Sequence, residues 1–283
     1  MNYIHKKISI LVILIAIIMG NLSDSFSQNN NLRTVRDSLT NYFTSISNEK
    51  SDDEKLKLNK NITRIFESYL SKSEAFINPI DSVKNIGLIK SPNDQLIIYT
   101  WNIPFNDGTH KYFGYIHYYN KRSKEYKLYA LNDRSEDIKN PEFSVLSNTN
   151  WYGLLYYKII ENKYKNHYYY TLLSSDLNNI LTKKKIIDVL QFDENDLPVF
   201  GAKVFSNLPR NTRIIFEYNA RANMTLTFDE TLKMIVYDHL SPSKPSLNGV
   251  FEFYGPDFSY DAYKFEKGRW EFKSDIDARN NRN

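Results

Sequence analysis

A run of alternating aromatic and polar residues near the end of the chain, Gly249 to Lys273, constrains the fold more than any other segment. Its end places Trp270 and Phe272 on one face and three charged side chains on the other, the period-2 pattern of a β-strand with one buried face. The two-residue link Lys267-Gly268 precedes this strand, and a short link that contains glycine is typical of a β-hairpin. The segment therefore predicts antiparallel pairing.

The first part of the same run predicts one more strand. Val250 to Tyr254 is aromatic and β-branched, with Phe251 and Phe253 on one face. Gly255-Pro256-Asp257 follows, and we expect it to end this strand because proline lacks the N–H that a sheet ladder needs. Residues 250–273 are thus expected to form a three-stranded meander whose aromatic face closes the core.

Similar short runs occupy most of the chain from residue 76 onward. The predicted strands are residues 96–103, 111–120, 125–131, 154–160, 167–173, 185–192, 199–205, 212–218, 224–228 and 232–237. About a dozen short strands at regular spacing predict an antiparallel sandwich, barrel or propeller-like domain over residues 76–283.

Residues 28–75 show a different period. Apolar residues spaced three and four apart, among them Leu32, Leu39 and Phe43, form one helical stripe, and a second stripe runs from Leu58 to Leu70. Ser51 followed by Glu54 has the spacing of a capping box at the start of the second helix. The segment predicts a helical hairpin ahead of the β domain, so the fold class is α+β and mainly β.

Residues 1–27 have the pattern of a secretory signal peptide. Lys6 and Lys7 precede a short apolar run, Ile8 to Met19, which small and polar residues follow. The chain has no cysteine, so a lipid cannot be attached there and the fold has no disulfide. We expect an exported protein, periplasmic or extracellular, that is not a lipoprotein and has no transmembrane segment in its mature form.

Composition argues against several functions. A net charge of +4 spread along 283 residues does not predict a nucleic-acid partner, because phosphate binding needs a concentrated basic face. The nine glycines are not arranged in a nucleotide-binding loop, so we expect no cofactor. The histidines are scattered singly along the chain, so we expect no set of metal ligands, and no residue is selected as catalytic. The acidic run Asp193 to Asp196 fits either a Ca²⁺ loop or an ordinary turn between strands, and we favour the turn.

The 22 tyrosines are the most unusual feature of the composition. Tyr118-Tyr119, Tyr156-Tyr157 and Tyr168-Tyr169-Tyr170 lie in predicted strands, where neighbouring side chains point to opposite faces. Outward rings can stack on sugars or on an apolar partner surface. Alternatively, tyrosine is simply a common strand residue that tolerates half-burial, and the runs then carry no binding role.

Two functions therefore remain open. The first is a non-enzymatic binding or envelope-associated module with an aromatic surface, whose partner is a glycan or an envelope protein. The alternative is a glycan-acting hydrolase that uses carboxylates of the C-terminal meander, because glycosidases act through a pair of acids. The candidate binding residues are Trp101, Trp151, Tyr254, Asp257, Tyr260 and Asp261.

Several phrases between residues 90 and 280 carry a resemblance. WYGLLYYKI, YYYTLLSSD, KKIIDVLQFD, LPVFGAKVF and YGPDFSYDAY together resemble a group of uncharacterised exported proteins from Gram-negative bacteria of the Bacteroidetes type. The resemblance implies a shared fold and export. It implies no activity, and it transfers no functional residue.

Overall fold

The computed structural model describes residues 30–277. Within these residues, two helices precede 14 antiparallel strands in three sheets, none of which closes into a barrel. The predicted α+β, mainly β fold class is confirmed. None of the helices in the described range is long and apolar enough to cross a membrane. The predicted signal peptide, residues 1–27, lies outside this range, so export stays a prediction.

The described chain divides into two compact units, residues 30–48 with 58–84 and residues 49–57 with 85–277. The first helix covers residues 30–48, and α2 spans Asp52–Leu70. Their apolar stripes are buried, as at Leu39 and Phe66. Ser51 Oγ accepts the Glu54 N–H at 3.4 Å, whereas the Ser51 N–H is bound by Glu49 Oε1, so the predicted capping box is half formed.

Each sheet is built from a continuous stretch of the chain. The first sheet contains β1 (Gly87–Lys90), β2 (Leu96–Pro104), β3 (His110–Asn120) and β4 (Glu125–Asn132), paired in that order. The middle sheet contains β5 (Leu146–Ser147), β6 (Leu155–Tyr164), β7 (His167–Asp176), β8 (Thr182–Phe192), β9 (Pro198–Phe200) and β10 (Ile214–Asn219). Its order is β5-β9-β8-β7-β6, with β10 also paired to β8.

The third sheet contains β11 (Leu226–Asp229), β12 (Met234–Pro242), β13 (Tyr254–Glu266) and β14 (Arg269–Lys273), paired in that order. The predicted hairpin across Lys267-Gly268 is confirmed, because Glu266 pairs with Arg269. Five short 3₁₀ helices lie between the described elements: η1 (Ser73–Phe76), η2 (Ser135–Asp137), η3 (Pro141–Phe143), η4 (Pro245–Leu247) and η5 (Phe251–Phe253).

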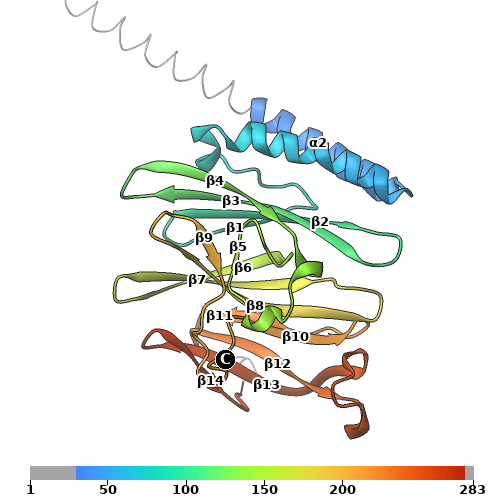
Figure 1. Ribbon diagram of the computed structural model, residues 1–283, viewed down its shortest axis with the longest axis vertical. Helices are drawn as coiled ribbons and strands as arrows, with labels where there is room; N and C mark the ends of the chain where they lie inside the picture. Colours follow the sequence, from blue (N-terminus) through green and yellow to red (C-terminus); the bar gives the residue numbers. More distant parts are fainter. Residues whose placement is uncertain (1–29, 278–283) are drawn as a thin grey trace, which may run out of the picture. The chain divides into compact units, whose positions relative to one another are not determined.

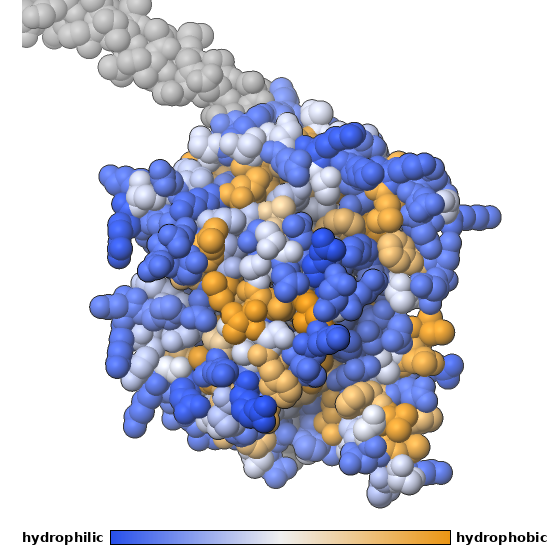
Figure 2. Space-filling view, in the orientation of Figure 1, coloured by the Kyte–Doolittle hydropathy of each residue, from blue (hydrophilic) through white to orange (hydrophobic). Residues whose placement is uncertain are grey.

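The prediction of a separate strand over Val250 to Tyr254 is wrong. Residues 251–253 form η5, and β13 runs without a break through Gly255-Pro256-Asp257. Pro256 pairs with Leu240 of β12, and β14 pairs only with Ala262 to Glu266, so at Pro256 the strand β13 has a neighbour on one side only, an edge position where proline occurs. Phe251 and Phe253 are exposed rather than in the core. Figure 2 shows hydrophobic side chains at the lower right, where Figure 1 places the segment between β12 and β13.

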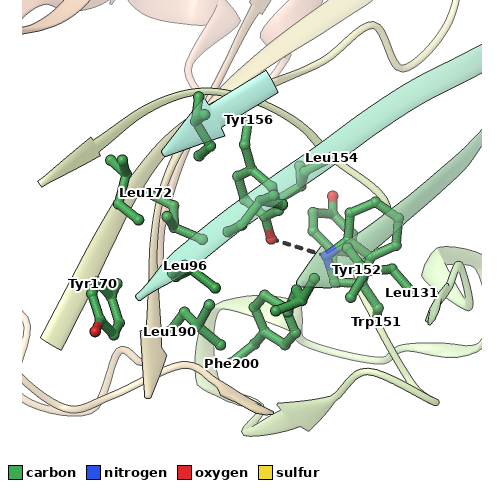
Figure 3. Packing of buried hydrophobic residues seen from close by; sticks show 14 of the residues in the cluster. Leu96, Leu131, Trp151, Tyr152, Leu154, Tyr156, Tyr170, Leu172, Leu190 and Phe200 are labelled. Atoms are coloured by element: carbon green, nitrogen blue, oxygen red, sulfur yellow. Dashed lines mark hydrogen bonds between the residues drawn. The ribbon is translucent and has the colours of Figure 1, made fainter. Parts of the chain in front are cut away.

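The three sheets of the second unit are stacked, and the middle sheet is covered on both faces (Figure 1). Leu172, Ile186 and Leu190 pack against the first sheet, as Figure 3 shows for Leu172 and Leu190. Their sequence neighbours Leu173, Ile187 and Val189 pack against the third sheet. Since side chains alternate along a strand, a sheet buried on both faces needs continuous apolar runs, which explains the run IIDVL in β8.

Candidate ligand-binding cleft

One cavity lies where the first and middle sheets end in loops. Its walls come from β3 and the β3–β4 turn, the β6–β7 turn, the start of β7, and the β8–β9 turn, and we call it the loop-end cleft. Its volume of 530 Å³ falls within the roughly 300–1,000 Å³ of small-molecule sites. The lining residues are Gln95, Tyr118, Asn120, Lys121, Arg122, Asn166, His167, Tyr168, Tyr170, Phe192, Asp193, Glu194 and Asp196.

Aromatic rings form the wall of the loop-end cleft. Tyr118 stacks on Phe192, with ring centroids 3.9 Å apart and planes at 13°, and Tyr170 meets Phe192 edge-on at 6.3 Å. Tyr118 and Tyr170 belong to the core between the first and middle sheets, so the wall is the open end of that core. Phe192 remains partly exposed, and the Tyr168 ring is 37% exposed with the Lys163 ammonium 4.9 Å from its centroid.

Hydrogen bonds hold the polar side of the cleft in place. Asp196 Oδ2 accepts from Asn120 Nδ2 and from Lys127 Nζ, both at 2.7 Å. Burial opposes ionisation of Asp196, but these two hydrogen bonds outweigh it and lower the pKa of its carboxyl. The Asp196 carbonyl also accepts the Tyr129 hydroxyl at 2.7 Å. The carboxylate therefore stays charged and fixed at neutral pH.

The acidic run Asp193 to Asp196 is a turn, as favoured from the sequence. Asp193 Oδ1 accepts the backbone N–H groups of Asn195 and Leu197, at 2.9 and 2.8 Å, and the Asp193 N–H donates to the Leu197 carbonyl. Such bonds within the loop are typical of an aspartate that caps its own turn. Among residues 30–277, no group of histidine, aspartate and glutamate side chains could hold a metal ion.

The polar lining mixes donors and acceptors with little net charge. The positive charges of Lys121 and Arg122 balance the negative charges of Asp193 and Glu194. The charge of Asp196 is already paired with Lys127. Asn93 Nδ2 donates to the Tyr170 hydroxyl at 2.9 Å, and burial raises the pKa of that tyrosine to about 12, so it stays protonated. The cleft can therefore offer rings to an apolar surface and hydrogen bonds to neutral hydroxyl groups.

Two of the predicted binding residues are in the core. Trp101 and Trp151 are both 0% exposed, which corrects the prediction that they belong to a binding surface. Trp101 stacks on Phe113 and Tyr115, with centroids 5.9 and 6.0 Å apart. Trp151 Nε1 donates to the Tyr156 hydroxyl at 2.9 Å, the dashed line in Figure 3. Both rings are used for packing, so neither can stack on a ligand.

The other four predicted residues lie on β13, two of them around a histidine that the sequence analysis did not select. His239 Nδ1 donates to Asp261 Oδ2 at 2.8 Å, and His239 Nε2 lies 4.0 Å from Asp257 Oδ2. The hydrogen bond with Asp261 raises the pKa of His239. Tyr254 instead binds Asn248, and Tyr260 is half-buried. The register of β12 on β13 creates this cluster, and no spacing in the sequence indicates it.

This cluster gives the hydrolase alternative no support. A glycosidase needs two carboxyl groups that flank the scissile bond, roughly 5–9.5 Å apart. Asp257 and Asp261 both approach the His239 imidazole, and Asp261 also accepts the Asp275 N–H at 3.3 Å, so these two carboxylates already have partners within the protein. Glu266, the third acid considered, pairs with Lys264 at 3.3 Å. Asp257 and Asp261 link β13 to His239 of β12, whereas Glu266 pairs within β13.

No protein family, curated protein or solved structure matches this chain. The resemblance to exported proteins of the Bacteroidetes type therefore stays a prediction. The function has to be argued from the loop-end cleft itself.

Proposed function

We propose that this chain is an exported, non-enzymatic binding module, and that it holds a neutral glycan in the loop-end cleft. The observation that carries the proposal is the pairing of an aromatic wall with a nearly charge-balanced polar side in one cavity of 530 Å³. The export and the kinship with Bacteroidetes-type exported proteins belong to the same proposal, and they rest on residues 1–27 and on the shared phrases.

The chemistry of the cleft suits a sugar. A pyranose has faces of C–H groups that pack on aromatic rings, and an edge of hydroxyl groups that both donate and accept hydrogen bonds. Tyr168 and Phe192 can take the apolar face, while Arg122 and Asn120 donate and Glu194 accepts. A strongly charged ligand would meet the opposite charges of Lys121, Arg122, Asp193 and Glu194 together, and it would gain little from them.

Calorimetric titration of the purified protein with neutral, acidic and amino oligosaccharides tests the proposal. We expect saturable binding of a neutral class. Tyr168→Ala should weaken this binding about tenfold, because loss of one stacking ring costs ~1.4 kcal/mol. The matched control is Tyr126→Ala, because Tyr126 is 39% exposed, close to the 37% of Tyr168, but does not line the cleft.

Three results would overturn the proposal. One is the absence of binding to every glycan class, and another is an equal loss of affinity in Tyr168→Ala and Tyr126→Ala. The third is glycan cleavage that Asp261→Asn abolishes, since that result would support the hydrolase instead. A binding module should tolerate Asp261→Asn without any loss of affinity, because Asp261 does not line the loop-end cleft.

A further inference from the structure

A second cavity, of 420 Å³, follows the strand β6, and we call it the β6 groove. Five consecutive residues of β6, Lys158 to Asn162, line it. One face of a strand presents only every second side chain. A cavity lined by five residues in a row therefore runs along the edge of the strand, beside the backbone. The remaining lining residues are Pro92, Phe228, Glu230, Lys233, Phe265 and Trp270.

The edge that faces this groove is unpaired. β6 is the last strand of the middle sheet and pairs with β7 alone. In the described part of the chain, no backbone hydrogen bond joins Lys158 to Asn162 to any strand other than β7. Alternate N–H and C=O groups of an antiparallel edge strand point away from its partner. The groove therefore presents a row of backbone donors and acceptors that another strand can bind.

A side chain in the groove also has a free acceptor. Asn162 Oδ1 is buried, and it has no hydrogen-bond partner among residues 30–277. Leaving a buried acceptor unpaired costs about 1–3 kcal/mol, so most such atoms in folded proteins have a partner. The atom lies beside an edge strand, where an N–H of an incoming backbone would satisfy it.

The rest of the groove favours an uncharged partner. Its apolar wall comes from the partly exposed rings of Phe228 and Phe265, and the buried Trp270 packs behind them. At the rim, Glu230 binds Lys158 at 2.8 Å and Lys233 at 3.1 Å through its two oxygens. Glu161, the fourth charged residue, accepts the Asn93 N–H at 3.0 Å. The two acids and two lysines balance, and each acid already has a partner, so an incoming segment needs no charge.

We propose that the β6 groove binds an extended, uncharged peptide segment of a partner protein, which joins the middle sheet as an additional strand beside β6. Its backbone pairs with residues 158–162, one N–H donates to Asn162 Oδ1, and an apolar side chain rests on the aromatic wall. A segment that matches these residues is about 17 Å long. This mode of recognition takes affinity from backbone bonds and selectivity from alternate side chains. The proposal is independent of the glycan site.

The test uses a fluorophore-labelled six-residue peptide of alternating valine and threonine with blocked ends. Fluorescence anisotropy with the purified protein should show saturable binding. Hydrogen exchange should slow at residues 158–162 and stay unchanged on β4, which is also the last strand of its sheet. Two further peptides carry N-methyl groups on alternate residues, in the odd or the even set. Only one of these sets should abolish binding, because a strand uses one edge to pair.

Asn162→Leu tests the free acceptor. We expect it to weaken peptide binding about tenfold while the melting temperature is kept or raised, because leucine removes a buried unpaired atom. Binding that both N-methylated peptides retain, protection on β4 instead of β6, or no anisotropy change would overturn the proposal. If Asn162→Leu does not fold, the wild-type protein with the two N-methylated peptides still decides the question.

Discussion

The two faces of the middle sheet are both buried, but one carries a buried ion pair and the other is apolar. Asp188 and Val189 are neighbours on β8, both are 0% exposed, and they point to opposite faces. Asp188 faces the first sheet and forms an ion pair with Arg213, Nε to Oδ1 at 3.1 Å, with both side chains buried. Val189 faces the third sheet within an apolar core.

The polar network on the first face reaches into irregular backbone. The Arg213 guanidinium also donates to the carbonyls of Pro141, Ser144 and Phe200. The other carboxylate oxygen of Asp188 accepts the Tyr156 hydroxyl at 3.3 Å. Residues 133–145 form mostly loop and short 3₁₀ turns, and the carbonyls of Pro141 and Ser144 lie outside the strands. The difference indicates that apolar side chains can fill the space between two regular sheets, whereas enclosed loop carbonyls need hydrogen-bond donors from side chains.

The largest loss of stability is expected when the carboxylate of Asp188 is removed from the first face of the middle sheet. Asp188→Ala should lower the free energy of unfolding by about 3–5 kcal/mol, because it leaves the Arg213 charge buried and unpaired. Val189→Ala on the opposite face should cost about 2 kcal/mol, from two lost methyl groups and a small cavity. Urea denaturation of both variants measures their free energies of unfolding. Equal losses of stability in the two variants would contradict the expected difference between the faces.

Replacing the whole ion pair by apolar residues sharpens the same comparison. Such replacements are often neutral or stabilising in other proteins. Here we expect the double variant Asp188→Leu, Arg213→Met to remain about 2–3 kcal/mol less stable than the wild type, because the loop carbonyls lose their donor. Stability equal to the wild type in urea denaturation would show that the ion pair does not position the loop.

A smaller loss of stability is expected when the hydrogen-bond partner of a buried tryptophan is removed from either core. Trp151 Nε1 donates to the Tyr156 hydroxyl on the first face, and Trp270 Nε1 donates to Thr171 Oγ1 at 3.0 Å on the second. Tyr156→Phe removes a hydroxyl with two partners and should cost about 2 kcal/mol, while Thr171→Val should cost about 1 kcal/mol. Thermal unfolding of both variants checks this order, and a reversed order would contradict it.

The smallest expected change in stability comes from the titration of two histidines outside the cores, His239 and His110. The pKa of His239 is raised by Asp261, so its contribution to stability is fully present below pH about 6.5 and is lost as pH rises through the folded pKa. Burial lowers the pKa of His110, so its contribution is present above pH about 6.5 and is lost as pH falls.

The stability difference between wild type and His239→Gln should therefore shrink from pH 5.5 to 8.5. The difference for His110→Gln should grow over the same range. Both changes should stay below ~1 kcal/mol, because His239 is half exposed and His110 is only partly buried. Urea denaturation at several pH values measures them, and slopes of the same sign for the two variants would contradict the assignment.

Local signals in the sequence were enough to predict most of the fold. The period of the apolar residues separates the helices from the strands, and Lys267-Gly268 marks its hairpin because short glycine links have few conformations. Met224 and Leu226 are buried while Thr225 and Thr227 are exposed, as their alternation predicts. The strand predicted at Val250 failed because composition alone cannot distinguish an exposed aromatic turn from a strand.

The candidate site could be predicted only in part. Tyr118 and the run Tyr168 to Tyr170 drew attention by composition, and the structure places three of these tyrosines in the loop-end cleft. Phe192 joins them only because β3 and β8 end, and β7 begins, at the same side of two stacked sheets. Contacts between residues more than 50 positions apart depend on how sheets stack, and no local pattern encodes that.

The continuous origin of each sheet has a consequence for how the chain reaches its final state. Contacts within a sheet are close in sequence, so the first sheet can form while later residues are still being synthesised. A chain that stops after residue 219 has every strand of the middle sheet but none of the third sheet. The face of the middle sheet that carries Leu173, Ile187 and Val189 would then be exposed to water. Interrupted synthesis after this point is therefore expected to produce aggregation rather than a smaller stable protein.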